Sequence, residues 1–329
     1  MACTLPPDTS TSDADLYCAL NTVVRNGTVV FTATDTSPEF EELLDNWLCH
    51  ARRLSIIPLV WALDETTHNK LRARTGADSV HSVYAPTVSL PAKARPNAYK
   101  KAGSEEYTLA VALKPLAVWK IVRLGFDALF LDVDVALISA SPLHWLRRST
   151  ADLQLSLNYD DRPAQQKVTV IPDLNTGVLY ARSSKGAAAL LEEWAKRTAE
   201  RHMCPRRPPL WACGDQEQIT RLLKQRCGWR PLSFERAASL ESANDAQRVA
   251  CGGAIGTLGI EVLPPRLFAS GQSSGLWQNR RAPADLLTFH PNFGGFAGGA
   301  KKAMLRRVRF ESSGGSAWCL ASRTERAQG

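Results

Sequence analysis

The sequence of 329 residues lacks any long apolar segment. No run of 18 apolar residues occurs, so the sequence predicts no transmembrane helix. The first 15 residues have neither a basic start nor an apolar centre, and they predict no signal peptide. We therefore expect a soluble chain without a membrane span.

The sequence also lacks closely spaced cysteines and any strong bias in its amino-acid composition. None of the eight cysteines forms a C-x-x-C pair, which argues against a zinc cluster. Hydrophobic residues make up 44% and charged residues 22% of the chain, which excludes disorder over its whole length. The even number of cysteines, with Cys204 and Cys213 in a proline-rich stretch, fits disulfides in a secretory lumen. Scattered buried thiols explain the same count nearly as well. The sequon Asn26-Gly27-Thr28 favours the lumen.

Positive charge is concentrated at the C-terminal end. The net charge is +8, and residues 301–329 hold seven bases and two acids, a difference of +5. This segment predicts either a solvated basic tail or a surface for anionic phosphate or polysaccharide. Aromatic residues do not alternate with these cations as a nucleic-acid platform requires, so we expect no nucleic-acid partner.

Alternating apolar runs predict an α/β fold with a parallel sheet. Residues 28–34 and 56–63 read as buried strands, each followed by an aspartate, and a helical pattern beginning at Pro38 separates them. Residues 79–106 read as a long loop, either a lid or a merely mobile excursion. Further strands are predicted at 128–131, 153–157, 169–171 and 174–180, and helices at 109–124, 183–199 and 216–224.

Two carboxylates follow the strand predicted at 128–131. Residues two apart in an extended segment point to the same side, so Asp132 and Asp134 are expected to present their carboxylates together. Carboxylate oxygens suit a hard divalent cation, which at this end of a parallel sheet could bridge the two phosphates of a nucleotide. A second D-x-D, Asp13-Ala14-Asp15, lies in the polar N-terminal stretch and follows no such strand.

Four ordered motifs resemble those of a known family. They are a helix containing Leu113-Lys114-Pro115 that leads into RLGFDALFLDVDV at 123–135, NTGVLY at 175–180, Gly214-Asp215-Gln216, and His290-Pro291-Asn292-Phe293 with a later lysine. Together they resemble the nucleotide-diphospho-sugar transferases of GT-A fold, closest to the plant and algal glycosyltransferase family 77. The resemblance implies one GT-A domain over 28–305, with a mostly parallel central sheet flanked by helices. It divides the chain into a polar leader (1–27), a nucleotide-binding half (28–135), an acceptor half (136–305) and a basic tail (306–329).

The resemblance also implies an activity. It is the metal-dependent, retaining transfer of galactose, xylose or arabinose from a nucleoside-diphosphate donor, a UDP-sugar, to a hydroxyl of a glycan or glycoprotein. The implied cofactor is Mn²⁺, with Mg²⁺ as the alternative, because an imidazole beside carboxylates favours Mn²⁺. The implied location is the Golgi lumen, although the membrane anchor usual in the family is not visible in this chain.

The matching motif positions carry the implied roles. Asp215 and Gln216 are the catalytic candidates, since a carboxylate facing the sugar could stabilise an oxocarbenium-like transition state. The implied metal ligands are Asp132, Asp134 and His290. The implied nucleotide-sugar-binding residues are Thr34, Asp35, Lys114, Asp132, Asn175, Gly177, Lys301 and Lys302.

Structural alternatives stay open for several of these residues. Asp35 and Asp215 could cap the helices that follow them, and His290 could be an ordinary loop histidine. Two other functions also compete. The strand ending in D-x-D resembles that of haloacid-dehalogenase-type phosphatases, where the first aspartate is the nucleophile. A non-enzymatic basic module that binds polyanions would explain the C-terminal charge but not the ordered motifs.

Overall fold

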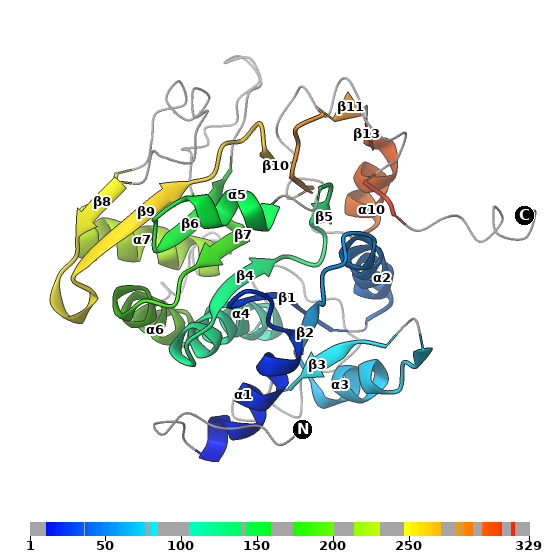
Figure 1. The fold of residues 1–329 in the computed structure, drawn as a ribbon, viewed down its shortest axis with the longest axis horizontal. Helices are drawn as coiled ribbons and strands as arrows, with labels where there is room; N and C mark the ends of the chain where they lie inside the picture. The colour runs from blue at the N-terminus through cyan, green and yellow to red at the C-terminus, as the bar shows by residue number, and fades with distance from the viewer. Residues whose placement is uncertain are drawn as a thin grey trace, which may run out of the picture.

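The computed structural model describes residues 11–35, 37–76, 79–84, 105–139, 142–158, 174–200, 214–230, 247–270, 281–282, 284–291, 298–310 and 317–319. Its helices and strands alternate along the chain (Figure 1). They are α1 Thr11–Val23, β1 Thr28–Thr34, α2 Pro38–Arg53, β2 Leu59–Ala62, α3 Glu65–Arg72, β3 His81–Val83, α4 Glu105–Arg123, β4 Asp127–Leu131, β5 Ala136–Leu137, α5 Pro142–Arg148, β6 Leu153–Leu157, β7 Leu174–Ala181, α6 Lys185–Ala199, α7 Asp215–Cys227, β8 Gln247–Ala250, η5 Gly253–Ile255, β9 Thr257–Val262, β10 Phe268–Ser270, β11 Arg281–Ala282, β12 Thr288–His290, α10 Gly298–Arg307 and β13 Arg309–Phe310.

The central sheet confirms the predicted α/β class. Its strand order is β3-β2-β1-β4-β7-β6-β9-β8. The strands β3, β2, β1 and β4 are parallel to one another, because helices return the chain between them. The other half is mixed: β7 is antiparallel to β4 and β6, β9 is parallel to β6, and β8 is antiparallel to β9. The parallel prediction therefore holds throughout only in the first half.

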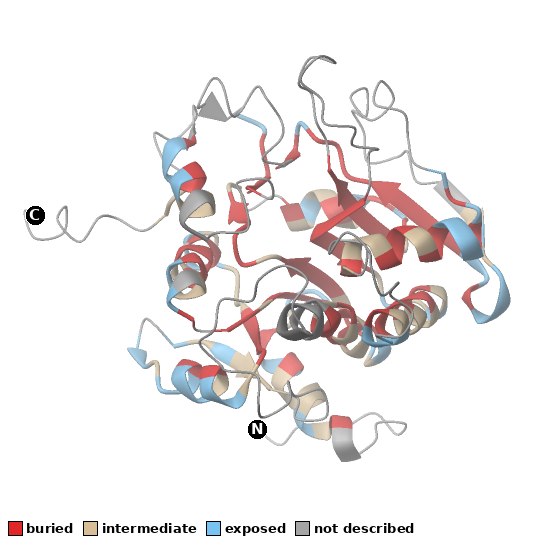
Figure 2. Cartoon of the chain, turned by 180° about the vertical axis from the view of Figure 1, so that it is seen from behind, coloured by how far each residue is buried: buried red, intermediate tan, exposed pale blue. Residues whose placement is uncertain are grey.

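Two hydrophobic cores lie on opposite faces of the sheet. In β1, Val29 and Phe31 belong to one core and Val30 to the other, as the alternation of side chains along a strand requires. Helices α1, α4, α6 and α7 supply the first core, and α2, α5 and α10 the second. Figure 2 shows the strands buried between these layers. The strands are therefore packed on both faces.

The predicted leader and tail both contain packed segments. Leu20 and Val23 of α1 lie in the first core, and Ala317 lies in the second. The domain boundaries at 28 and 305 stay predictions. The strand predicted at 169–171 and the pair Cys204 and Cys213 lie outside the described residues. So do residues 85–104, which make up most of the predicted long loop.

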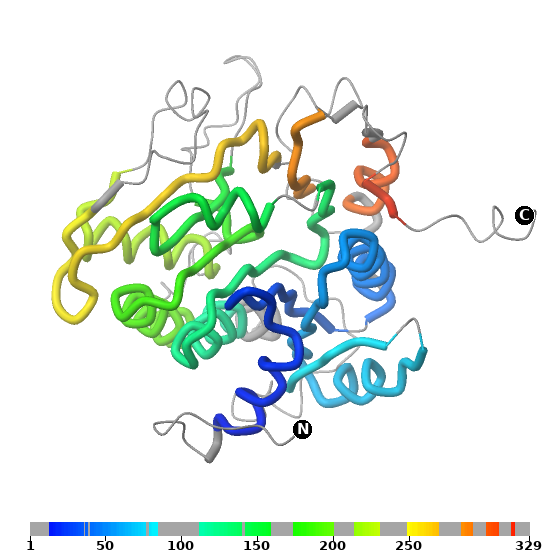
Figure 3. Tube along the Cα trace, viewed as in Figure 1, coloured from blue at the N-terminus to red at the C-terminus, as the bar shows by residue number. Residues whose placement is uncertain are grey.

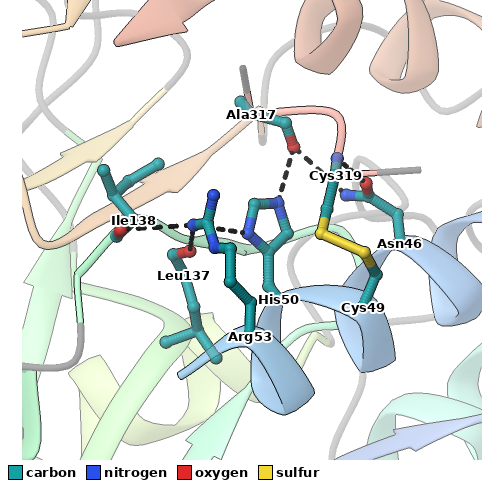
Figure 4. Close-up of a disulfide and its surroundings, with 8 residues drawn as sticks. All are labelled: Asn46, Cys49, His50, Arg53, Leu137, Ile138, Ala317 and Cys319. Carbon is teal, nitrogen blue, oxygen red and sulfur yellow. Dashed lines mark hydrogen bonds between the residues drawn. A yellow bond between two sulfur atoms is a disulfide. The ribbon is translucent and has the colours of Figure 1, made fainter. Parts of the chain in front are cut away.

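A disulfide fastens the C-terminal segment to α2. Cys49 of α2 bonds to Cys319, which lies 270 residues further along the chain (Figure 4). Asn46 reinforces the contact, since its Oδ1 accepts from the Cys319 amide at 2.6 Å and its Nδ2 donates to the Ala317 carbonyl at 3.2 Å. A second disulfide joins Cys227 to Cys251. Within the described part of the chain no cysteine is free, which decides for disulfides over scattered thiols.

His50 lies buried beside this disulfide. Its Nε2 lies 2.9 Å from the Ala317 carbonyl, which can only accept, so Nε2 carries the proton. Its Nδ1 then accepts from Nη2 of Arg53 at 3.2 Å (Figure 4). Burial lowers the pKa of His50 to about 4, against an ordinary value of 6.5, because a second proton would place a charge in the core next to Arg53.

This shift makes stability depend on pH in a defined window. The neutral, buried His50 stabilises the folded chain fully above pH 6.5. This contribution to the free energy of unfolding is lost as the pH falls towards 4, because only the unfolded chain takes up the proton in that range. Between pH 7 and pH 5 we expect a loss of about 2 kcal/mol from His50. Urea denaturation of the wild type and of His50→Gln at both pH values tests this. The glutamine amide can donate to Ala317 but never titrates. Equal pH dependence of the two chains would contradict the assignment.

Candidate active site

The two aspartates of the D-x-D motif leave β4 through a tight turn. The Asp132 amide donates to the Gly177 carbonyl of β7 at 2.8 Å, and the Val135 amide donates back to the Asp132 carbonyl at 2.9 Å. The second bond closes a β-turn over residues 132–135. The sequence predicts an extended segment here, and this part of the prediction is wrong. The carboxylates nevertheless come together, because the turn folds both towards β12.

His290, at the end of β12, completes a group of three side chains that could hold a metal ion. Ligand atoms of Asp132, Asp134 and His290 all lie within 4.8 Å of one another. His290 Nε2 is 3.4 Å from Asp134 Oδ1 and 3.6 Å from Asp132 Oδ2. Asp134 and His290 are buried, whereas Asp132 is partly exposed. Two carboxylates and one imidazole at this spacing fit a divalent cation with a preference for oxygen and nitrogen ligands.

Asn175 of β7 sets the orientation of the His290 ring. Its Oδ1 lies 2.8 Å from the Gly177 amide and 3.2 Å from His290 Nδ1. The Gly177 amide can only donate, so the Asn175 atom facing it is the oxygen, and His290 Nδ1 must donate to that oxygen too. Nε2 of the same ring then faces the two aspartates. A hydrogen bond of this kind behind a histidine fixes the tautomer that binds metal.

Gly177 makes room for the same ring. A Cβ atom at residue 177 would lie 2.1 Å from His290 Cε1 and 2.4 Å from His290 Nδ1. The family resemblance implies that Asn175 and Gly177 bind the nucleotide sugar. In the structure both residues support His290, and Asn175 is buried. The N-x-G motif therefore serves the histidine that follows it by more than a hundred residues.

Lys301 joins this group from α10, and Lys302 does not. Lys301 Nζ lies 2.6 Å from Asp134 Oδ2, whereas Lys302 Nζ lies 3.1 Å from Oε2 of Glu42 on α2. Successive residues of a helix point about 100° apart, so only one of the two lysines can face the aspartates. Figure 3 shows α10 beside α2, far from it in sequence. Burial alone would raise the pKa of Asp134, but Lys301 and His290 outweigh it and hold that pKa well below its usual range.

Lys114 of α4 links Asp132 to Asp215. Its Nζ lies 2.9 Å from Asp132 Oδ1, 2.9 Å from Asp215 Oδ2 and 3.2 Å from Thr176 Oγ1. Burial alone would lower the pKa of Lys114, but the two carboxylates outweigh it and raise that pKa above its ordinary value. Asp215 is the first residue of α7, and the N-cap is Gly214. Its side chain therefore faces Lys114 and does not cap the helix.

The remaining predicted residues lie at the edge of this arrangement. Thr34 ends β1, and its hydroxyl donates to the Asp35 carbonyl at 3.0 Å. Asp35 Oδ1 accepts from the amide and the hydroxyl of Ser37, at 3.0 and 2.7 Å, and so shapes the turn before α2. Gln216, the second residue of α7, is partly exposed. The structure thus gathers six of the predicted side chains into one cluster: Lys114, Asp132, Asp134, Asp215, His290 and Lys301.

Comparison with known proteins identifies the family. A model of the nucleotide-diphospho-sugar transferases matches residues 57–302, more than half of the chain. The chain belongs to this family. The match confirms the resemblance inferred from the ordered motifs. The family match decides against the phosphatase and against the non-enzymatic module.

The individual relatives of this transferase have low sequence identity to it. The beta-arabinofuranosyltransferase RAY1 of Arabidopsis thaliana is 27% identical over 184 residues, which are 53% of this chain and 31% of that protein. The chain thus spans about a third of the length of the curated relative it matches. Among solved structures, the galactosyltransferase LgtC has a TM-score of 0.42 at 11% identity and covers 91% of this chain and 99% of its own. Mouse xyloside xylosyltransferase 1 has a TM-score of 0.42 at 13% identity, with 81% and 98% covered.

Two further observations complete the description of the transferase. Within the described ranges no helix is long and apolar enough to cross a membrane. Thr176, which no sequence motif indicated, also belongs to this site, since its hydroxyl donates to Asp215 Oδ2 at 2.7 Å. The signal for it was weak, because Thr176 occupies the variable position of the N-x-G motif and a lone threonine in a strand indicates no function.

Proposed function

We propose that this transferase moves a sugar from a UDP-sugar to a hydroxyl of a glycan or glycoprotein, with a divalent cation, Mn²⁺ or alternatively Mg²⁺. The observation that carries the proposal is the group formed by Asp132, Asp134 and His290, with Lys301 beside it. Two carboxylates and an imidazole can hold a cation, and the adjacent lysine can bind a diphosphate, so the group suits both together. Lys301 contributes a positive charge where the leaving diphosphate needs one, and we assign no such role to Lys302.

Each side chain has a separate part in the proposed reaction. Asp132, Asp134 and His290 would hold the cation, which neutralises charge on the diphosphate as it leaves. Thr34 and Asp35, at the carboxyl end of β1, would bind the nucleoside. Asp215 would face the donor sugar, where a fixed carboxylate stabilises developing positive charge. Gln216 lies next to it and would contact the same sugar. Asn175 and Gly177 would act through His290.

Asp215 is placed to stabilise charge and not to form a covalent bond. Lys114 and Thr176 both hold its Oδ2, which makes the carboxylate a weaker nucleophile. We therefore propose that the acceptor hydroxyl attacks from the face that the diphosphate leaves, so that the anomeric configuration is retained. The disulfides Cys49–Cys319 and Cys227–Cys251 support a location in an oxidising compartment such as the Golgi lumen.

A panel of nucleotide sugars tests the proposal directly. UDP-arabinose is the first donor to test because one relative is named as an arabinofuranosyltransferase, and UDP-galactose and UDP-xylose follow. Each is incubated with the protein and Mn²⁺, and release of UDP and free sugar is measured by mass spectrometry. We expect turnover of at least one donor and its loss when EDTA is added. Absence of turnover for every donor, with the protein shown to be folded, would overturn the proposal.

A further inference from the structure

The two oxygens of the Asp215 carboxylate differ in their contacts. Oδ2 lies 2.9 Å from Lys114 Nζ and accepts from Thr176 Oγ1 at 2.7 Å. In the part of the chain that the structure describes, no hydrogen bond or ion pair reaches Oδ1. The side chain is one-tenth exposed, so a ligand can approach that oxygen. An ionised carboxylate oxygen without a partner is a strong acceptor for a sugar hydroxyl.

Lys114 alone does not fix this arrangement. An ammonium group attracts a carboxylate from many directions, and Asp132 Oδ1 draws the same Nζ atom at an equal distance of 2.9 Å. The direction comes from Thr176, whose hydroxyl accepts from Lys114 at 3.2 Å and donates to Asp215 Oδ2. Lysine, threonine and aspartate thus close a ring of three polar contacts.

Thr176 is itself held firmly. It is buried in β7, where the pairing with β6 shifts register, from Leu155 opposite Leu179 to Ser156 opposite Asn175. Such a bulge turns side chains away from the regular alternation of a strand. Here Asn175 reaches His290 and the next residue, Thr176, reaches Lys114 and Asp215. A β-branched side chain also has few rotamers, so the hydroxyl keeps its direction.

We propose that Thr176 is a positioning residue for sugar transfer: it ties Asp215 Oδ2 to Lys114, so that Oδ1 alone is left to accept one hydroxyl of the donor sugar. This inference rests on the proposed function and assigns it a further residue. The chemical class recognised is a donor sugar with a hydroxyl that can donate to a carboxylate. Thr176 does not touch the sugar in this scheme and acts only through Asp215.

The test uses two substitutions at residue 176. Thr176→Val keeps the shape but removes the hydroxyl, so that Asp215 Oδ2 loses its donor inside the protein. We expect kcat with the best donor of the panel to fall about 10- to 100-fold, the range for a lost hydrogen bond to a charged group. Thr176→Ser restores the hydroxyl and is expected to stay within about threefold of the wild type. Calorimetric binding of UDP with Mn²⁺ is expected to remain unchanged in both.

Thr32→Val is the matched control. Thr32 is fully buried in β1, and its hydroxyl has no hydrogen bond to any residue that the structure describes, so its removal is expected to leave kcat unchanged. Deoxy analogues of the best donor, each lacking one hydroxyl, then locate the contact. The analogue that lacks the hydroxyl facing Oδ1 is expected to be slow in the wild type and to suffer no additional loss in Thr176→Val.

The outcomes separate the inference from the proposed function. If the wild type turns over a donor and Thr176→Val keeps the wild-type kcat, the inference is wrong and the proposed function stands. Equal damage from Thr176→Ser and Thr176→Val would also overturn it, because the hydroxyl would then not be the relevant group. If the folded wild type turns over no donor, the proposed function and the inference fail together.

Discussion

Asp134→Asn is expected to abolish Mn²⁺-dependent binding of UDP and to lower sugar transfer by about a thousandfold. Asp134 is buried, 3.4 Å from His290 Nε2 and 2.6 Å from Lys301 Nζ. The asparagine has nearly the same shape but cannot supply the negative charge on which a cation depends. It also leaves the Lys301 ammonium without its buried carboxylate. Isothermal titration of UDP into the variant with Mn²⁺ measures the loss.

The chain contains its own control for this substitution. Asp15 belongs to the other D-x-D, in α1, and is exposed. Asp15→Asn removes the same charge from the same type of motif and is expected to bind UDP as the wild type does. Thermal unfolding shows whether each variant is folded. If folded Asp134→Asn binds UDP with the wild-type affinity and still requires Mn²⁺, then Asp134 is not a ligand and the proposed site is wrong.

Gly177→Ala is expected to damage stability and metal binding together. The added Cβ would lie 2.1 Å from His290 Cε1, a distance that no relaxed structure keeps. His290 cannot move away without losing Asn175 on one side and Asp134 on the other. We expect the free energy of unfolding to fall by about 2 to 3 kcal/mol and Mn²⁺-dependent UDP affinity to fall about 10- to 100-fold. Urea denaturation and calorimetry measure the two effects.

Two controls show whether the clash with His290 is the cause. Gly252→Ala places a Cβ no closer than 4.0 Å to its nearest neighbour, at a φ of −71° that any residue adopts, and is expected to be neutral. In the second control, Gly177→Ala is combined with His290→Ala, which removes the ring. The double variant is expected to be about as stable as His290→Ala alone. If the losses in the free energy of unfolding add in the double variant, the clash of the new Cβ with the His290 ring is not the cause.

The strand pattern explains which parts of the sheet were predictable. The runs at 28–34 and 128–131 are continuous and apolar because both faces of β1 and β4 are covered by helices. A helix between two such runs makes the pair parallel. The mixed half was not predictable in this way, since β7 lies between β4 and β6 by long-range pairing that no local pattern indicates. The direction of β7 was decided by its burial and by its hydrogen bonds to strands that are distant in the sequence.

The same division holds within the active site. Motif order brought Asp132, Asp134, Asp215 and His290 into one hypothesis, because each residue type suits a diphosphate and a cation. It could not decide between Lys301 and Lys302, since only the packing of α10 on α2, through Glu42, determines which lysine turns inwards. It also gave no indication that Asn175 and Gly177 lie against His290, because that contact joins residues more than a hundred positions apart.

The sequence by itself determined the fold class, the family and the chemical types of the site residues. The absence of an apolar span and of C-x-x-C spacing argued against a membrane helix and a zinc cluster, and the apolar strand ending in two aspartates predicted a nucleotide site at that end of the sheet. The tertiary structure alone decided which oxygens and nitrogens face one another. Thr176, Lys114 and Asp215 come from β7, α4 and α7, and their ring of contacts forms only when the three elements pack. Local propensity fixes elements one at a time, whereas hydrogen-bond geometry depends on the distances between them.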